Sequence, residues 1–356
     1  MQIQETFPIL KDYIYLNTAY SGLLSSNIAK WRRAHDEDFM KGGGIFRANN
    51  LEVIEKLRFN LSSTFSSKLS NTFLTSNFSI GFNAILNGLT LEHRFLILEE
   101  DYPSVSFPVK SLGFDFLEVQ IQADFENDIV KAIEKFKPTV FAFSMVQYIS
   151  GLRMQSKFIK KLKSNFPDLL LIADGTQFIG TGAFNFEESG LDALIGSGYK
   201  WLLGGYGNGY LFLSDVLRNL IYEKGKTVVL PSNPMLNGRD YLSLILEPGH
   251  LDSLNFGSLN ESLNYLNAIG LDTIEDINNK TCNKARLMFN QKGLLADWII
   301  ERPEQSTIIS VPLKKETIDK LEKANILFAA RGAGTRISFH FYNTLEDLDR
   351  FMELLD

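Results

Sequence analysis

The sequence predicts an α/β protein in which a large, doubly wound and mostly parallel sheet is followed by a smaller α+β domain at the C-terminal end. The first observation is that short aliphatic runs alternate with amphipathic helical stretches between residues 72 and 213. Strands that alternate with helices in this way form a parallel sheet with crossover helices on its faces. The second observation is that this alternation stops beyond residue 213, which indicates a second unit.

The first elements are predicted to be helices. Residues 28–40 and 50–67 have helical patterns on either side of Gly42-Gly43-Gly44, which we interpret as a helix stop followed by a turn. This glycine run lacks a preceding strand and the Lys-Ser/Thr ending of a phosphate-binding loop. A nucleotide-phosphate site at this position is therefore disfavoured.

Strands and helices then alternate through the predicted sheet. The aliphatic runs are typical of strands that are buried on both faces. The run at 209–213 is expected to be the last strand of the large sheet. The predicted strands are 72–75, 95–98, 140–143, 169–174, 193–195 and 209–213, and the predicted helices are 79–90, 125–136 and 155–166.

The rest of the chain is predicted to be a compact α+β unit. Residues 223–255 are rich in Gly, Pro, Asn and Ser and show little periodicity. Thr344 and Asp347 form a usable capping pair for the final helix. We therefore expect residues 31–240 to form the large domain and residues 241–356 the small C-terminal domain. The elements predicted there are helices near 258–270 and 272–295, strands at 307–312 and 336–341, and helices at 315–323 and 345–355.

Composition argues against several classes of protein. The 356 residues are 45% hydrophobic, which is enough for a substantial core. Lys and Arg total 36 against 42 Asp and Glu, so the net charge is −6, and no clustered basic face for nucleic acid is visible. Neither a run of about eighteen apolar residues nor a basic and then apolar leader is present, so we expect no membrane span and no signal peptide. Cys282 is the one cysteine, which fits a reducing, cytoplasmic location.

The segment from Leu169 to Lys200 contains the residues with the clearest chemistry. An aliphatic run ends at Asp174, and the next short run is followed by Ser197 and Lys200. The carboxyl ends of strands in an open α/β sheet meet at the crevice where ligands bind, so we expect these side chains to converge there. They suit pyridoxal phosphate, because they provide a Schiff-base amine, an acid for the pyridinium nitrogen and a hydroxyl for the phosphate.

The residues around Asp174 and Lys200 also resemble the class V aminotransferase family. The resemblance rests on Asp174-Gly175-Thr176-Gln177 and Ser197-Gly198-Tyr199-Lys200-Trp201, followed by glycines at 204, 207 and 209. This family of fold-type I pyridoxal phosphate enzymes includes cysteine desulfurases, selenocysteine lyases and isopenicillin N epimerase-like proteins. The resemblance covers nearly the whole chain, and it implies a homodimer with the active site at the interface and a segment 1–30 that packs with the small domain.

The resemblance implies a role for each residue of this segment. Lys200 would form the Schiff base with the cofactor, and Asp174 would pair with the ring nitrogen. Gln177 would bond the phenolic oxygen, and Ser197 would bind the phosphate.

Two further segments are expected to bind the phosphate. Residues 75–79 join a strand to a helix, and the start of a helix binds anions through its free N–H groups. Asn77, Phe78 and Ser79 occupy the place of the family's Gly-Thr-Thr pattern; the alternative is that Ser79 only caps the helix. Ser258 resembles a hydroxyl that reaches the partner subunit's cofactor in this family, and its alternative role is also a helix N-cap.

The ring-stacking position is predicted from the loop after residue 99. Many family members have a histidine there, but this chain has none in that loop, so Tyr102 is predicted to lie against the ring. Without a histidine, Lys200 is the expected base. Either Gln147 or Tyr148 is expected near the phenolic oxygen, with an ordinary loop as the alternative.

Arg336 is the predicted substrate carboxylate site. The segment 335–344 resembles the family's arginine strand, and the planar guanidinium matches a carboxylate in a bidentate manner. The alternative is an ordinary arginine on a surface strand. Asn17 and Ala19 are expected to line the same pocket, while Arg47 and Arg331 are unassigned cations that could face an anionic substrate.

The sequence departs from cysteine desulfurases at the position of their sulfur-accepting cysteine. The short segment 328–334 contains no cysteine, and Cys282 is interpreted as a small core residue in a helix. A persulfide-forming desulfurase is therefore disfavoured.

We thus expect a pyridoxal phosphate enzyme that acts on a small amino acid, as an aminotransferase or as a C–S or Cβ lyase. Transamination, elimination and racemisation diverge from a common carbanion, and no residue identified here separates them. An isopenicillin N epimerase-like amino-acid epimerase is the alternative, and a catalytically silent cofactor-binding regulator is a further one. A dinucleotide-binding oxidoreductase is disfavoured because the chain has no strand–GxGxxG–helix unit.

Overall fold

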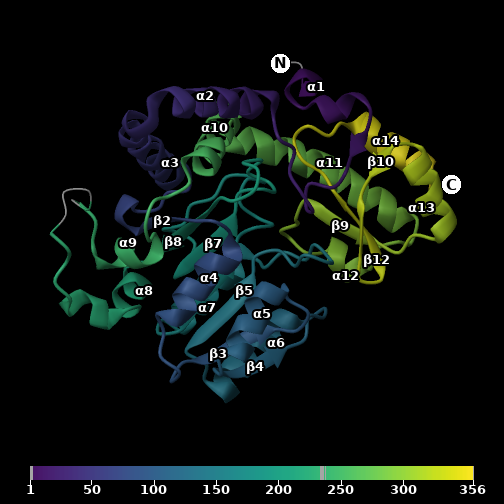
Figure 1. Ribbon diagram of the computed structural model, residues 1–356. Coiled ribbons are helices and arrows are strands. Elements are labelled where there is room, and N and C mark those ends of the chain that lie inside the picture. The colour runs from purple at the N-terminus through teal and green to yellow at the C-terminus, as the bar shows by residue number, and fades with distance from the viewer. Residues whose placement is uncertain (1–2, 233–235, 237, 356) are drawn as a thin grey trace.

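The computed structural model describes residues 3–232, 236 and 238–355 (Figure 1). Its centre is a seven-stranded sheet with the strand order β2-β8-β7-β6-β5-β3-β4. Strand β8 runs antiparallel to its neighbours β2 and β7, and the other adjacent pairs are parallel. The predicted α/β fold with a mostly parallel sheet is therefore confirmed. The strands are β2 (Thr72–Thr75), β3 (Arg94–Leu98), β4 (Asp115–Val119), β5 (Val140–Ser144), β6 (Leu170–Asp174), β7 (Ala193–Ser197) and β8 (Gly209–Leu213).

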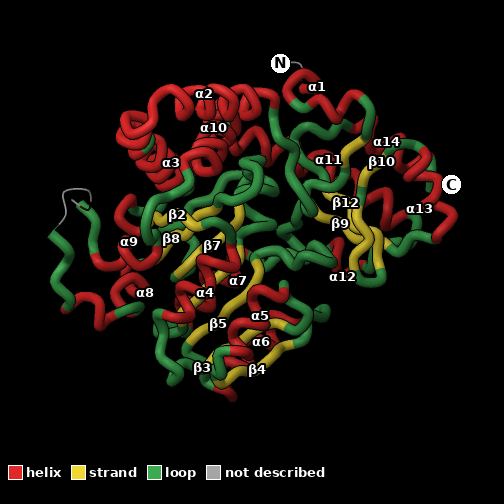
Figure 2. Tube along the Cα trace, viewed as in Figure 1, coloured by secondary structure: helices red, strands yellow, loops and turns green. Residues whose placement is uncertain are grey.

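Helices cover both faces of this sheet, as in a doubly wound fold (Figure 2). The core on one face includes side chains of α3 (Leu51–Thr64), α6 (Phe125–Phe136), α7 (Ser156–Asn165) and α10 (Ser253–Ile269). The core on the other face includes side chains of α4 (Phe78–Asn87), α5 (Pro103–Ser111), α8 (Asp215–Leu220) and α9 (Tyr241–Leu246).

Strand β6 shows how this double cover shapes the sequence. Leu171 and Ala173 belong to the first core, and Leu170 and Ile172 belong to the second. Because both faces are buried, the strand is a continuous apolar run rather than an alternation of apolar and polar residues. The run ends with Asp174 at the carboxyl edge of the sheet.

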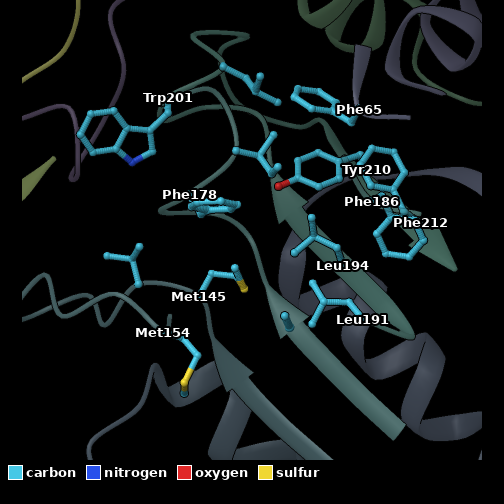
Figure 3. Packing of buried hydrophobic residues seen from close by; sticks show 14 of the residues in the cluster. Phe65, Met145, Met154, Phe178, Phe186, Leu191, Leu194, Trp201, Tyr210 and Phe212 are labelled. Carbon is cyan, nitrogen blue, oxygen red and sulfur yellow. The ribbon is translucent and has the colours of Figure 1, made fainter. Parts of the chain in front are cut away.

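Aromatic rings pack under β7 and β8 in the first core (Figure 3). The rings of Tyr210 and Phe212 stack with centroids 5.0 Å apart, and the Phe65 ring lies 6.5 Å from that of Tyr210. A Cβ on Gly196 would lie only 2.1 Å from the Tyr210 hydroxyl oxygen. The glycine before Ser197 therefore allows β7 to lie close to this ring.

The N-terminal helices differ from the prediction at the glycine run. Helix α2 spans Ser26–Asn49 and does not stop at Gly42; it kinks at Gly43, whose φ of 46° and ψ of −119° are not helical. Glycine reaches this positive φ at little cost, so the predicted break is present as a kink between two helical segments, and only the turn expected to separate them is missing. Two short helices, α1 (Ile3–Thr6) and η1 (Pro8–Lys11), precede α2.

A smaller sheet with the order β11-β12-β9 forms the centre of the C-terminal region. Its core contains Cys282, Phe289, Leu321 and Phe351, together with Leu16 from the N-terminal segment. That segment also contributes β1 (Ile14–Tyr15), which pairs in parallel with β10 (Ile326–Leu327). The other elements are α11 (Leu271–Gln291), α12 (Asp297–Ile300), β9 (Ile308–Val311), α13 (Lys315–Lys323), β11 (Ala329–Arg331), β12 (Gly334–Ser338) and α14 (Leu345–Glu353).

The division into residues 1–30, 31–240 and 241–356 remains a proposal. Leu259, Leu263 and Leu266 of α10 belong to the core of the large sheet. On packing grounds, we would place the second boundary after α10, close to residue 270.

Several element boundaries were predicted wrongly or missed. Helix α5 and strand β4 were not predicted, because α5 has Pro103 at its start and Pro108 inside it, and the first residues of β4 are exposed. Helix α10 begins at Ser253 with Asp252 as its N-cap, so Ser258 lies inside the helix and does not cap it. The predicted capping pair of Thr344 and Asp347 is confirmed as a capping box. Residues 223–255, where the sequence shows little periodicity, contain α9, the short helix η3 (Glu223–Thr227) and the first residues of α10, and η2 (Leu69–Asn71) precedes β2.

A buried ion pair connects α3 to the edge of the large sheet. The Glu247 carboxylate accepts hydrogen bonds from Arg58 Nη1 at 2.6 Å and Nη2 at 2.9 Å, and from the Leu74 backbone N–H at 2.6 Å. The Glu247 side chain is 2% exposed and that of Arg58 is 14% exposed. This pair therefore fixes β2 immediately before the turn into α4.

Replacing Glu247 by alanine should strongly destabilise the fold. The change leaves the guanidinium of Arg58 and the N–H of Leu74 without their buried partner, so the free energy of unfolding should fall by about 3–5 kcal/mol. Urea denaturation measures the loss. The control is Glu52→Ala, which removes an exposed partner of Lys56 and should leave the unfolding midpoint nearly unchanged. Equal midpoint shifts in the two variants would contradict the role given to Glu247.

Candidate active site

A cavity of about 530 Å³ opens at the carboxyl ends of β6 and β7. Eight of the predicted site residues line it: Asn77, Phe78, Ser79, Tyr102, Asp174, Gln177, Ser197 and Lys200. Five others do not: Asn17, Ala19, Gln147, Ser258 and Arg336. The sheet edge thus brings together residues from three separate parts of the sequence.

Asp174 lies at the end of β6 with its carboxylate almost fully buried. Its Oδ1 accepts a hydrogen bond from the Thr176 N–H at 2.8 Å. Burial raises the pKa of Asp174 to about 6, against the lowering effects of the hydrogen bonds from Thr176 and the charge of Lys200. The carboxylate is therefore desolvated and forms no ion pair within the described part of the chain, which favours a cationic ligand group beside it.

Lys200 follows β7 by three residues, and its side chain is also buried. Its Nζ lies 5.8 Å from the Tyr102 ring centroid and 5.5 Å from that of Tyr199. Burial lowers the pKa of the amine from 10.5 to about 8; Asp174 opposes this shift, and the charges of two nearby arginines add to it. The amine is therefore neutral at a lower pH than an exposed lysine.

The N-terminus of α4 forms a second wall of the cavity. Asn77 is the N-cap, and its Oδ1 accepts from the Ile80 N–H at 3.0 Å. The Phe78 N–H donates to Ser197 Oγ at 2.9 Å, and Ser79 Oγ donates to Ser104 Oγ at 2.8 Å. The alternative in which Ser79 caps the helix is therefore wrong. A helix start with two hydroxyls beside it can bind an anion.

Gln177 lines the cavity with an amide that is already oriented. Its Nε2 donates to the Ala19 backbone oxygen at 2.8 Å, and its Oε1 accepts from Trp201 Nε1 at 2.9 Å. An amide nitrogen carries two hydrogens, so one remains for a ligand. Ala19 therefore acts on the cavity through its backbone carbonyl.

The loops that carry Tyr102 and Tyr148 form the third wall of the cavity, which we call the tyrosine wall. The rings of Tyr102 and Tyr148 meet edge to face with centroids 5.3 Å apart. The Gln147 amide is already occupied: its Oε1 accepts from the N–H groups of Ile149 and Ser150, both at 2.7 Å, and its Nε2 donates to the Glu100 carbonyl at 2.9 Å. Of the two predicted alternatives, the geometry therefore favours Tyr148 over Gln147 as a cavity residue.

Ser258 lies away from the cavity in this chain. Its Oγ donates to the Leu254 carbonyl and accepts from Arg32 Nε, both at 2.7 Å. The side chain is completely buried. Its predicted contact with a partner subunit's cofactor remains a prediction.

Arg336 is buried on β12 rather than exposed on a surface strand. Its Nη1 donates to the backbone oxygen of Tyr148 at 2.6 Å, and its Nε is buried without a partner among the described residues. Burial, and then the charge of Arg331, lower the pKa of Arg336 to about 10. Asn17 forms a β-bridge with Ser338 on the same strand, and its Oδ1 is likewise buried and unpaired within the described chain.

Several cavity residues were not predicted. Tyr199 and Tyr206 stack with centroids 4.8 Å apart, and Thr176 Oγ1 accepts from the Ser197 N–H at 3.1 Å. Thr176 and Tyr199 belong to the two motifs around Asp174 and Lys200, and this position in the sequence could have identified them as cavity residues. Tyr206 has no such signal. The remaining lining residues are Ser76, Ile80, Ser144, Val146 and Gly207.

Residues 3–232, 236 and 238–355 contain no cluster of three or more His, Cys, Asp or Glu side chains that could hold a metal ion. Within the same residues, no helix has the length and apolar character needed to span a bilayer.

Comparison with known families agrees with this geometry. Residues 44–351 match the model of the aminotransferase class-V family. The chain belongs to this family. Members of the family are pyridoxal phosphate enzymes, and the predicted resemblance is thus confirmed.

Two curated relatives match nearly the full length. The chain is 22% identical to a "probable cysteine desulfurase" of Ureaplasma parvum, over 97% of this chain and 93% of the relative. It is 20% identical to an uncharacterized aminotransferase of Bacillus subtilis, over 98% of this chain and 95% of the relative.

Solved structures show the same fold. The cystine C-S lyase C-DES in complex with cysteine persulfide superposes with a TM-score of 0.84 at 18% identity, covering 98% of this chain and 99% of that one. A cysteine desulfurase from Thermococcus onnurineus superposes with a TM-score of 0.80 at 17% identity, covering 99% and 96%.

Lys200 should react with acetic anhydride as an amine of lowered pKa. Its reactivity should rise near pH 8, where an ordinary lysine with a pKa of 10.5 is still mostly protonated. In Asp174→Asn the rise should move to lower pH, because the carboxylate that raises the pKa of Lys200 is gone. Mass spectrometry of the acetylated Lys200 peptide across pH measures both effects. A profile that matches the exposed lysines, or an upward shift in Asp174→Asn, would show that the pair does not share one buried site.

Proposed function

We propose that this chain is a pyridoxal phosphate-dependent enzyme that acts on a small amino acid, as an aminotransferase or as a C–S or Cβ lyase. One observation carries the proposal: the Lys200 amine and the Asp174 carboxylate are both buried in the wall of one cavity, beyond the ends of adjacent strands. Membership of a family of pyridoxal phosphate enzymes supports it.

The residues around the cavity fit this cofactor. The start of α4 and the hydroxyl of Ser197 suit its phosphate, because helix N-termini bind anions. The volume of about 530 Å³ lies within the range of about 300–1,000 Å³ that is usual for cofactor sites. Tyr102 offers a ring close to Lys200, and Gln177 retains an N–H for the phenolic oxygen.

Asp174 and Lys200 divide the chemistry between them. When bound, pyridoxal phosphate supplies an electron-withdrawing ring that stabilises negative charge on the substrate carbon beside it. The buried carboxylate of Asp174 holds a proton on the ring nitrogen, since a desolvated anion favours a cationic partner. Because the pKa of Lys200 is lowered, more of its amine is neutral near pH 7. The neutral amine would act first as a nucleophile and then as a proton acceptor.

Arg336 is the proposed site for the α-carboxylate of the substrate. Its guanidinium is buried, and it donates to the Tyr148 carbonyl rather than to an acid within the described residues. A carboxylate would pair with this charge and provide the partner that Nε lacks. Because Arg336 also holds the Tyr148 backbone, it connects substrate binding to the cavity wall.

Lysis of a C–S bond is included in the proposal, but a cysteine relay is not. Relatives named as a desulfurase and as a C-S lyase support chemistry at sulfur. Cys282, however, lies in α11 within the small core, and burial raises the pKa of its thiol to about 11. A thiol of this kind is a poor sulfur acceptor.

We also propose that the enzyme is a cytoplasmic homodimer. Apolar side chains on α2 support a subunit contact, since Phe39, Met40 and Ile45 are 57%, 80% and 74% exposed. A cross-subunit role for Ser258 would require its hydrogen bond from Arg32 to open. Light scattering that gives the mass of two chains would support the dimer, and the mass of one chain would refute it.

The cofactor-loaded protein should absorb visible light, and borohydride should fix the cofactor to Lys200. Among the described residues that line the cavity, Lys200 is the lysine, so the adduct is expected on its amine. Peptide mapping of the reduced protein identifies the site. Lys200→Ala should lose the covalent adduct, and Lys68→Ala, on the surface, should retain it. An adduct on another lysine would refute the proposed function.

Cys282→Ser should leave the activity of the loaded enzyme unchanged on cysteine and on other amino acids. The thiol lies in the core around β9 and β12, beside Arg286, and not in the cavity wall, so its loss affects that core and not the site. Release of sulfide, keto acid and ammonia is measured together with the melting temperature. Selective loss of sulfur release in a folded Cys282→Ser protein would mean that the thiol takes part in the reaction.

A further inference from the structure

Two arginines project from one face of the hairpin formed by β11 and β12. Ala329 lies opposite Arg336 in the antiparallel register, and Arg331 lies two residues further along β11, opposite Gly334. Residues that face each other across an antiparallel pair, and residues two apart along a strand, point to the same side of the sheet. Arg331 and Arg336 are therefore diagonal neighbours on one face, with Cα atoms about 7–8 Å apart.

This hairpin contacts the tyrosine wall of the cavity. Arg336 Nη1 donates to the backbone oxygen of Tyr148 at 2.6 Å. At the hairpin turn, a Cβ on Gly332 would lie 3.1 Å from Ile149 Cγ2, so the turn packs against the residue after Tyr148. The charge of Arg331 also acts on the Lys200 amine, where it adds to the lowering of the pKa by burial. Because Arg331 is the diagonal neighbour of Arg336, a substrate held by Arg336 lies within reach of both guanidinium groups.

Within residues 3–232, 236 and 238–355, neither guanidinium is paired with a carboxylate. Arg331 Nη1 donates to the Ala330 carbonyl at 3.2 Å, and its guanidinium lies 5.2 Å from the Tyr20 ring centroid. Arg336 donates to the Tyr148 carbonyl. One α-carboxylate fills one guanidinium fork in the bidentate arrangement. When Arg336 binds the α-carboxylate, the guanidinium of Arg331 is still without an anionic partner.

We propose that Arg331 binds a second acidic group, at the end of the substrate side chain, while Arg336 binds the α-carboxylate. The substrates are then amino acids with a short anionic side chain, such as aspartate or glutamate. This inference rests on the proposed function, because it assigns the substrate class of the same site. The half-buried position of Arg331 at a hairpin turn suits an end group that enters from solvent.

Spectroscopic titration of the cofactor-loaded protein tests the inference. Aspartate and glutamate are compared with asparagine and glutamine, which have the same shapes without the charge, and with alanine. Wild type should bind at least one acid about tenfold to hundredfold more tightly than its amide, since a charged hydrogen-bond partner is at stake. Arg331→Gln should lose this preference while its Kd for alanine stays unchanged.

Three variants separate the roles of the charges. Arg331→Lys should restore only part of the preference, because a point charge cannot reproduce the fork. Arg336→Ala should weaken binding of all five amino acids, alanine included. Arg350→Gln is the matched control: it removes one positive charge from α14, where the exposed Arg350 pairs with Glu353, and should bind like wild type.

The outcomes distinguish this inference from the proposed function. Absence of a cofactor adduct on Lys200 in wild type would refute the function. If the adduct forms but wild type binds acids no better than amides, Arg331 does not recognise a side-chain anion and the function stands. Equal weakening of alanine and aspartate in Arg331→Gln would place both arginines on one carboxylate and would also overturn the assignment. If Arg331→Gln fails to fold, the wild-type comparison and Arg331→Lys decide.

Discussion

Three hydrogen bonds connect the groups that surround the cavity. The Phe78 N–H donates to Ser197 Oγ, the Ser197 N–H donates to Thr176 Oγ1, and the Thr176 N–H donates to Asp174 Oδ1. The chain of bonds runs from the start of α4 to the end of β7 and on to the end of β6. Asp174, Ser197 and Phe78 belong to β6, β7 and α4, and Thr176 lies in the turn after β6, so the bonds tie this turn to three elements of the sheet layer. The buried carboxylate is thereby linked through hydrogen bonds to the start of α4, the proposed phosphate site.

The lysine loop is held from the opposite side by the two ends of the chain. The Gly22 N–H donates to the Tyr199 carbonyl at 2.8 Å, and a Cβ at Gly22 would lie 2.0 Å from the carbonyl oxygen of Lys200. On the C-terminal side, His340 Nε2 contacts the Trp201 carbonyl at 3.1 Å. The backbone around Lys200 is thus fixed by segments that are distant in sequence. Only a residue without a side chain fits at position 22.

Local sequence patterns predicted that Asp174 and Lys200 converge, but they did not predict which loop side chains face the cavity. Asp174 and Lys200 were predictable because each follows an apolar run, and parallel strand ends converge at one edge. Tyr148 and Gln147 could not be separated, since neighbouring loop residues differ only in which way the loop turns them. Ser258 was taken for a possible cap because α10 begins earlier than its apolar pattern, at the polar Asp252. The kink at Gly43 was unpredictable for a related reason: glycine permits a stop or a bend, and packing decides between them.

The pairing of β1 with β10 has a consequence for how the protein is made. Ile14 pairs with Ile326, so nearly the whole chain must leave the ribosome before the first strand meets its partner. The entropic cost of closing so long a loop rises only with the logarithm of its length. The pairing of β1 with β10 is therefore slow to form, but its free-energy cost is modest. Until then the large sheet can form, but Gly22 and Ala19 have no fixed place against the lysine loop. A nascent or truncated chain that ends before residue 326 would hence contain Asp174 and Lys200 with one wall of the site missing, and the amine would acquire its dry surroundings only after Ile326 has been made.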